Sequence, residues 1–266
     1  MKLTLAITAY NETRRGAGEW LQECIAPALE HPGVGEVFVV DDGSVDWLNT
    51  AASLPNHPKI RFMHLGQNLS VFGAKIASVC HAHGDWVQLC DSDNVMNKEY
   101  LDSLLEAILD VPWNTWICPS FARPVFDYRK FVQPHAYDLP GFASLIGMEG
   151  FECLANTGNM CVPRNLFDNV FRRYLGKRAD LMFPNWLEYE DPTTEHARQV
   201  FNALDSFMLN LEWLTHAGRL WVVEDLEYAH RVTGKAEDSN YNRGPDDKDR
   251  MGKFLVAELA RRAKSW

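Results

Sequence analysis

Short apolar segments alternate with amphipathic segments through the first 110 residues of the chain. Four runs are rich in apolar and β-branched residues and have the length of strands: residues 3–8, 36–40, 60–65 and 85–90. Three further segments place their apolar residues at helical spacing: residues 20–29, 71–82 and 98–109. This alternation predicts an α/β fold with a Rossmann-like, mainly parallel central sheet and helices on both faces.

The pattern becomes less regular after residue 110. Residues 156–163 predict a turn that leads into a strand, and a helix over residues 203–217 precedes a strand over residues 219–223. The polar stretch 234–249 is rich in Asp, Asn, Gly and Lys, which predicts a mobile loop. An amphipathic helix is expected to close the chain over residues 251–264.

Polar residues follow three of the predicted strands, at the point where each strand ends. They lie at residues 8–12, 41–44 and 91–93. Because ligands of open α/β sheets bind outside the carboxyl ends of parallel strands, these three clusters should line one crevice. The sequence therefore predicts a single binding site at this edge of the sheet.

Two of the three clusters are acidic. Asp91 and Asp93 stand two residues apart directly after a strand, and such hard oxygen ligands suit Mg²⁺ or Mn²⁺ bound to phosphate oxygens. Asp41 and Asp42 repel each other unless a hydrogen-bond donor, such as a nucleobase imide, engages one of them. Each cluster has a plainer interpretation as the turn that ends a strand, since Asp, Ser and Gly are favoured there.

The composition narrows the class of ligand. Hydrophobic residues make up 46% of the 266 residues, enough for a sizeable core, and the formal net charge is −10. An acidic surface argues against polynucleotide binding, which needs many cationic side chains. It leaves room for a small phosphorylated ligand, because one divalent cation can neutralise a diphosphate locally.

Cysteine usage and hydropathy indicate the compartment. The six cysteines form no CxxC pair and are expected to be small buried side chains in a reducing compartment, with no zinc site or disulfide framework. The apolar N-terminal run is short and suits a buried first strand better than a signal peptide. No stretch approaches the length of a membrane span, so we expect a cytoplasmic protein unless another subunit carries it to a membrane.

Three motifs, in this order and at this spacing, resemble the nucleotide-binding half of a family 2 glycosyltransferase with the A-type fold. They are Thr8-Ala9-Tyr10-Asn11-Glu12, Val39-Val40-Asp41-Asp42-Gly43-Ser44 and the Asp-x-Asp motif Asp91-Ser92-Asp93-Asn94. The resemblance is good over about 110 residues and continues more loosely to about residue 230. Ser70 stands where the family usually has glycine, and Ala74-Lys75 replaces the usual Ala-Arg.

The resemblance implies a role for each donor-side residue. Thr8, Ala9 and Tyr10 would line the nucleotide pocket, Glu12 would support the ribose or base, and Asp41 would accept the imide N–H of the base. Lys75 would approach a phosphate or the base, with a solvated helix lysine as the alternative. Asp91 and Ser92 would lie at the ribose, and Asp91, Asp93 and His230 are the expected ligands of Mn²⁺ or Mg²⁺. A lone His such as His230 is also often structural.

The second half would supply the catalytic base and the acceptor site. Asp205 matches the family's catalytic aspartate by position and by the helix pattern that follows it, although the preceding acid of the family is absent. The alternative is that Asp205 caps that helix. The fallback bases are Glu188, Glu190 and Asp191. Sugar rings stack on aromatic faces, which makes Trp186, Tyr189 and Trp213 candidates for an acceptor platform, with burial in the core as the alternative.

The resemblance thus implies a metal-dependent, inverting transfer of a sugar from a nucleoside-diphosphate sugar, with UDP favoured, to a hydroxyl of a glycan or other acceptor. Residues 1–110 would bind the donor, residues 111–233 would hold the acceptor and the base, and residues 234–266 would form the mobile loop and the last helix. Two alternatives remain open at this stage. One is a nucleotidyltransferase, and the other is a sugar- or nucleotide-binding module that has lost turnover.

Overall fold

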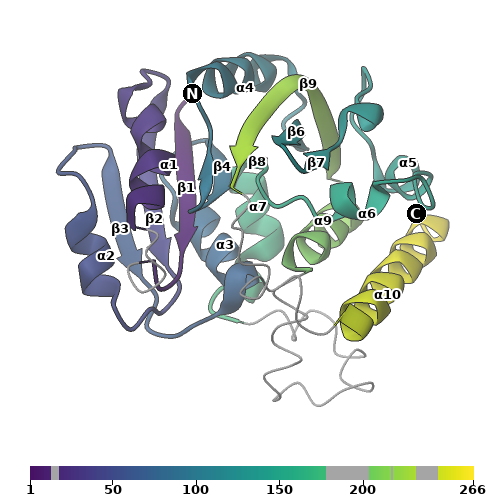
Figure 1. Ribbon diagram of the computed structural model, residues 1–266. Helices are drawn as coiled ribbons and strands as arrows, with labels where there is room; N and C mark the ends of the chain where they lie inside the picture. Colours follow the sequence, from purple (N-terminus) through teal and green to yellow (C-terminus); the bar gives the residue numbers. More distant parts are fainter. Residues whose placement is uncertain (13–17, 178–203, 217, 232–244) are drawn as a thin grey trace.

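The computed structural model describes residues 1–12, 18–177, 204–216, 218–231 and 245–266. Its strands form one sheet in the order β3-β2-β1-β4-β8-β6-β9-β5, with β7 paired to β6 (Figure 1). The strands of the first half are β1 (Leu3–Ala9), β2 (Val34–Asp41), β3 (Ile60–His64), β4 (Trp86–Asp91) and β5 (Asn94–Val95). Those of the second half are β6 (Thr115–Arg123), β7 (Phe126–Asp127), β8 (Cys161–Pro163) and β9 (Arg219–His230).

The first four strands are parallel, as the sequence pattern predicts. The short strand β8 is antiparallel to both β4 and β6, and it joins the two halves of the chain into one sheet. β6 and β9 are again parallel to each other, whereas β5 is antiparallel to β9. The sheet is therefore mixed, with a parallel N-terminal part and antiparallel strands inserted at β8 and β5.

Helices cover both faces of the sheet (Figure 1). They are α1 (Gly18–Glu30), α2 (Trp47–Ser53), α3 (Ser70–His81), α4 (Lys98–Asp110), α5 (Leu139–Ala143), α6 (Phe151–Ala155), α7 (Arg164–Phe171), α9 (Asp205–Thr215) and α10 (Pro245–Lys264). Two short 3₁₀ turns, η1 (Arg129–Phe131) and η2 (Arg172–Tyr174), complete the described helices.

Two apolar clusters show which helices pack on which face. Leu5 and Ile7 of β1 join α1 and α4 in one cluster, whereas Ala6, which points the other way, joins α3, α7, α9 and α10 in the second. Helices cover both faces of β1. Its sequence is therefore mostly apolar, without the regular alternation of apolar and polar residues found in a strand with one exposed face. The helix α3 is buried along almost its whole length, from Phe72 to Cys80.

Three local features differ from the sequence prediction or add to it. The strand expected over residues 219–223 continues to His230, past the polar pair Glu224 and Asp225. A register shift against β6 and a left-handed backbone at Asp225 (φ 59°) let the pairing resume beyond that pair. Five of the six cysteines are buried as expected, and Cys153 is exposed.

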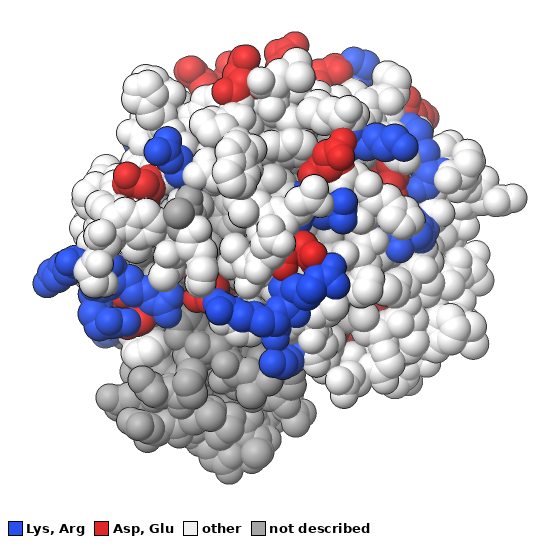
Figure 2. All heavy atoms as spheres, turned by 180° about the vertical axis from the view of Figure 1, so that it is seen from behind, with Lys and Arg blue, Asp and Glu red and all other residues white. Residues whose placement is uncertain are grey.

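Charge is distributed unevenly over the surface. On the face seen in Figure 2, Lys and Arg form a band across the lower part, while Asp and Glu gather along the upper edge. Among the cationic side chains, Arg173 of η2 and Arg262 of α10 both contact the buried Glu212 of α9. No described helix is long and apolar enough to cross a membrane.

Candidate active site

The carboxyl ends of β1, β2 and β4 lie next to one another, as the sequence predicts. Thr8 pairs in register with Val40 on one side and with Asp91 on the other, and Ala9 pairs with Asp41. The residues that follow these strands must therefore leave the sheet at the same edge. Thr8 is half-buried, Ala9 is buried, and Tyr10 is 43% exposed at this edge.

Hydrogen bonds tie the three loops together. Glu12 is buried, and its Oε1 accepts hydrogen bonds from the Ser92 hydroxyl at 2.7 Å and from the Tyr10 backbone N–H at 3.2 Å. The backbone N–H of Asn11 donates to the Ser44 hydroxyl at 2.7 Å. The loop after β1 is thereby fixed to the loops after β2 and β4, which organises this edge of the sheet.

Asp41 occupies a different environment from the one expected. Its side chain is fully buried, and its carboxylate accepts hydrogen bonds from the Ser44 backbone N–H at 2.9 Å and from His64 Nδ1 at 2.8 Å. The Ser44 hydroxyl also donates to it. Asp41 thus organises the turn after β2, and its expected contact with a nucleobase imide stays a prediction.

The neighbouring Asp42 is also buried. Its Oδ1 accepts the Leu69 backbone N–H at 2.7 Å and so holds the chain just before α3. The pKa of Asp42 is raised to about 7, mainly by burial and also by the charge of Asp41, against the lowering effect of the backbone hydrogen bonds from Leu69 and Ser70.

Asp91 is held by Asn159, a residue to which the sequence assigns no contact. The Asn159 Oδ1 accepts the Asp91 backbone N–H at 2.9 Å, and its Nδ2 donates to Asp91 Oδ2 at 3.2 Å and to the Tyr228 hydroxyl at 3.0 Å. The Asp91 side chain is 38% exposed, so its other oxygen can face a ligand. The only signal in the sequence is that Asn159 lies in a predicted turn.

Asp93 lies in the turn between β4 and β5, and His230 is the last residue of β9, which pairs with β5. Asp93 directly precedes Asn94, which pairs in register with His230. The Asn94 Oδ1 lies 2.9 Å from His230 Nδ1. Because a carboxamide oxygen only accepts hydrogen bonds, Nδ1 carries the hydrogen and the lone pair of the neutral ring lies on Nε2.

The expected set of three metal ligands is not gathered. Across the described parts of the chain, no three His, Cys, Asp or Glu side chains form a group that could hold a metal ion. The carboxylate of Asp91 also contacts Asn159 and Lys75, at 3.2 and 3.7 Å, and its role as a metal ligand stays a prediction. Asp93 and His230 form the candidate pair considered below.

Asp205 and Lys75 form a buried ion pair. Asp205 is the first residue of α9, and the capping position belongs to Leu204, so Asp205 is not the helix cap. Its Oδ2 lies 3.0 Å from Lys75 Nζ and 3.1 Å from the Ser206 hydroxyl. Burial raises the pKa of Asp205, which the Lys75 ammonium lowers and the Asp91 charge raises. Lys75 therefore points to Asp205 and Asp91, and it is not the solvated helix lysine of the alternative interpretation.

Trp213 is a core residue. It is fully buried, its ring stacks on Trp116 with centroids 4.7 Å apart, and its Nε1 donates to the Arg219 carbonyl at 2.8 Å. It therefore offers no face to a sugar ring, which corrects the expected acceptor role. Trp186, Tyr189 and the fallback bases Glu188, Glu190 and Asp191 lie outside the described residues.

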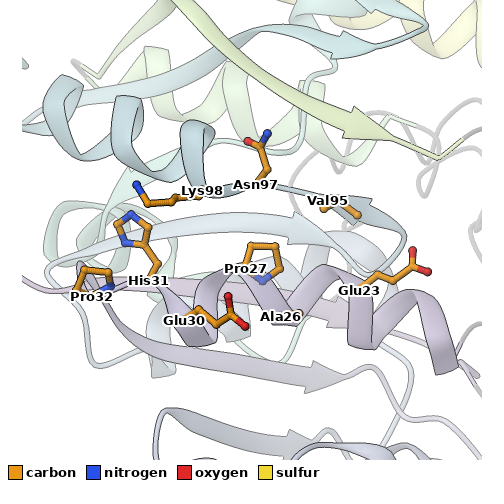
Figure 3. Close-up of a pocket in the computed structure, with 9 residues that line it drawn as sticks. All are labelled: Glu23, Ala26, Pro27, Glu30, His31, Pro32, Val95, Asn97 and Lys98. Atoms are coloured by element: carbon orange, nitrogen blue, oxygen red, sulfur yellow. The ribbon is translucent and has the colours of Figure 1, made fainter.

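A separate hollow of about 670 Å³ lies between α1 and the segment from β5 to α4 (Figure 3). None of the expected site residues lines it. Two of its polar side chains, His31 and Lys98, both contact Asp102. It shows no pair of carboxylates at strand ends, the feature on which the sequence prediction of the site depends.

Comparisons with known proteins identify the family of the chain. The model of the family "Glycosyl transferase family 2" matches residues 4–170. The succinoglycan biosynthesis protein ExoO of Rhizobium meliloti (strain 1021) is 30% identical over 105 residues, which cover 39% of this chain and 29% of ExoO.

The fold is similar to solved structures of TarS from S. aureus. The TarS 1–349 structure in complex with UDP-GlcNAc has a TM-score of 0.60 at 15% identity, over 97% of this chain and 66% of that one. A longer TarS structure gives 0.57 at 16% identity, over 100% of this chain and 44% of that one. The chain thus spans less than two thirds of the length of these proteins. Because the family model covers more than half of its residues, this chain belongs to family 2 of the glycosyltransferases.

Proposed function

We propose that the protein transfers a sugar from a UDP-sugar to a hydroxyl of a glycan or other acceptor, by a single displacement that inverts the anomeric carbon. The observation that carries this proposal is the position of Asp205, which lies close to Asp91 at the donor-side edge of the sheet. Its carboxylate shares the Lys75 ammonium with Asp91, although the two acids lie far apart in the chain. A base and a donor site in such proximity suit a direct transfer.

The donor side would be formed by the edge of β1 and β4. Tyr10 is the exposed residue there, and Thr8 and Ala9 would line the pocket behind it. Asp91 would accept hydrogen bonds from the ribose, while Glu12 and Ser92 hold the loops in place. UDP is the favoured nucleotide because the similar TarS structures were solved with UDP-GlcNAc and with UDP.

The donor set of Asp93 and His230 fits a divalent cation that also binds a diphosphate. Mg²⁺ and Mn²⁺ are usually held by one or two protein groups and completed by phosphate oxygens and water, so a pair of ligands suffices. The hydrogen bond from His230 to Asn94 fixes the ring in the form that presents a lone pair on Nε2. Such an ion would supply stabilisation of the charge that develops on the departing diphosphate.

Asp205 would act as the general base. Burial raises its pKa, which makes the carboxylate a stronger proton acceptor than an exposed aspartate. As the acceptor oxygen forms its bond to the anomeric carbon, its proton moves to the carboxylate of Asp205. The bond from the anomeric carbon to the diphosphate breaks, and its electron pair leaves with the nucleoside diphosphate. No covalent intermediate between sugar and protein is required.

The first experiment is a thermal unfolding series with UDP, GDP, TDP and CMP, each with and without Mn²⁺. A ligand at a hundred times its Kd adds about 2.7 kcal/mol to the free energy of unfolding. We expect stabilisation by UDP that depends on Mn²⁺ and is lost in Asp93→Ala. As a control, Asp110→Ala removes an exposed acid at the end of α4, away from the crevice, and should leave the response intact.

Turnover separates the proposal from its alternatives. Release of UDP from a UDP-sugar, by transfer or by slow hydrolysis, is expected. Release of pyrophosphate from a nucleoside triphosphate would identify a nucleotidyltransferase. Binding of UDP with neither reaction would identify a module that has lost turnover, and no response to any nucleotide would remove the proposal altogether.

A further inference from the structure

A lysine is buried at the centre of the candidate site. Lys75 lies in α3 and is 3% exposed, among neighbours in the same helix that are also buried. Its ammonium lies 3.0 Å from Asp205 Oδ2, 3.1 Å from the Ser206 hydroxyl and 3.7 Å from Asp91 Oδ1. A buried ammonium is costly unless it is paired and hydrogen-bonded, and these three oxygens meet that need.

These contacts join three elements that are distant in the sequence. Asp91 ends β4 on the donor side, Asp205 begins α9, and the ammonium from α3 lies between their carboxylates. Without the ammonium, the negative charges of Asp91 and Asp205 would repel each other. The ammonium therefore sets where the Asp205 carboxylate lies relative to Asp91.

Gly158 provides the space for this ammonium. A Cβ atom at this position would lie 2.4 Å from Lys75 Nζ and 2.4 Å from the Ser206 hydroxyl oxygen, far inside van der Waals contact. The next residue, Asn159, holds Asp91 by two hydrogen bonds. Two consecutive residues of one loop thus pack against the lysine and against one of the acids that it contacts.

We propose that Lys75 is a positioning residue that fixes the carboxylate of Asp205 relative to the donor-side Asp91, and that Gly158 is required because the ammonium fills the place of a side chain. This inference rests on the proposed function, since Asp205 is there the base. In this proposal Lys75 acts by positioning the Asp205 carboxylate, and it does not contact the nucleotide as the family resemblance implies. Its loss should therefore impair turnover and spare donor binding.

The first test compares Lys75→Met and Lys75→Arg with the parent protein. A displacement of a catalytic group by about 1 Å costs about a hundred-fold in rate. We expect Lys75→Met to lower kcat by about that factor while the Kd for UDP, measured by calorimetry, changes less than about three-fold. Lys75→Arg keeps the charge and should restore part of kcat. A tenfold higher Kd for UDP with an unchanged kcat would show that Lys75 binds the donor and would overturn the proposal.

The second test moves the ammonium without removing it. Gly158→Ala keeps every charge of the site, and we expect it to reproduce the loss of kcat seen in Lys75→Met. Gly66→Ala is the matched control, because a Cβ there meets no atom within 4 Å. In a Lys75→Ala background, the further effect of Gly158→Ala on kcat should shrink, since the two changes remove the same arrangement. Strictly additive effects would contradict the contact.

A crystal structure of Lys75→Met, or of Gly158→Ala if the first does not fold, gives a readout that does not depend on activity. We expect the Asp205 carboxylate to leave its position beside Asp91 in either variant. An unmoved carboxylate would overturn the positioning role even where kcat falls. An inactive parent protein would instead refute the proposed function, and the crystallographic outcome would still decide whether Lys75 positions Asp205.

Discussion

At the scale of single residues, burial decides the chemistry of the acids. Asp205 and Asp91 differ mainly in exposure: the side chain of Asp205 is 8% exposed and that of Asp91 is 38% exposed. Asp41 and Asp42 are adjacent at the end of β2. Their carboxylates accept backbone N–H groups, from the turn after β2 and from the chain just before α3. The sequence alone does not distinguish these acids, and only the structure separates the proposed base, Asp205, from the two that hold loops.

Asp205→Asn tests the base directly. The amide keeps the shape of the side chain but accepts no proton, so we expect turnover to fall by about a hundred-fold to ten-thousand-fold, with the Kd for UDP nearly unchanged. Because burial raises the pKa of Asp205, the acid limb of the pH–kcat profile of the parent protein should lie above the ordinary value of 3.8. Steady-state assays across pH measure both quantities. Near-normal transfer by the variant would rule out Asp205.

Asp42→Asn tests the raised pKa of that acid through stability. The folded protein binds a proton at Asp42 up to about pH 7, whereas the unfolded chain releases it near 3.8, so the free energy of unfolding of the parent falls as pH rises through this window. Asparagine can still accept the Leu69 N–H. We expect the variant to gain stability relative to the parent between pH 4 and 7, by a few kcal/mol at most at about 1.4 kcal/mol per pKa unit. Urea titrations at several pH values measure this, and parallel curves would contradict it.

At the scale of elements, the sequence predicted four strands and three helices of the first 110 residues to within a few positions, because each is an uninterrupted apolar run or a clear amphipathic period. It missed the short α2 and β5 there and, in the less regular second half, β6, β7, α5, α6 and α7. It ended β9 too early because Glu224 and Asp225 interrupt the apolar run. It also predicted the meeting of the three strand ends. The contacts of Asn159 and Gly158 escaped it, since contacts across many residues of the chain leave no local pattern.

The start of α3 offers a test of backbone strain. Ser70 has a left-handed backbone (φ 66°) at the position where the family usually has glycine. A residue with a Cβ pays about 1–2 kcal/mol for this conformation, whereas glycine adopts it freely. We expect Ser70→Gly to raise the Tm by a few degrees. Glycine at Ser78, in the middle of the same helix with ordinary geometry, should lower it. A lower Tm for Ser70→Gly would show that the serine makes a compensating contact.

Asn159 links the loop before β8 to two strands. Its loss leaves the Asp91 N–H and the Tyr228 hydroxyl without this partner, which costs about 1–3 kcal/mol for buried groups. We expect Asn159→Ala to lose stability of that order and to bind UDP more weakly, because Asp91 is no longer held. Chemical denaturation and calorimetry measure the two effects. Asn169→Ala, at an exposed position of α7, is the control and should change neither.

At the scale of the whole molecule, the donor side and the base belong to one cooperative structure. β4 pairs with β1 on one side and with β8 of the second half on the other, and the apolar cluster around α3 contains residues from Ala6 to Leu259. We therefore expect a single unfolding transition, with coincident curves from far-UV circular dichroism and tryptophan fluorescence.

A fragment of residues 1–110 tests this directly. It would expose the side of β4 that pairs with β8 and the face of α3 that α7 and α9 cover. It should show no cooperative transition and no response to UDP. A fragment that unfolded cooperatively would mean that donor binding can be separated from the half that carries Asp205, and the ion pair between Lys75 and Asp205 would then lie at a boundary between two folding units.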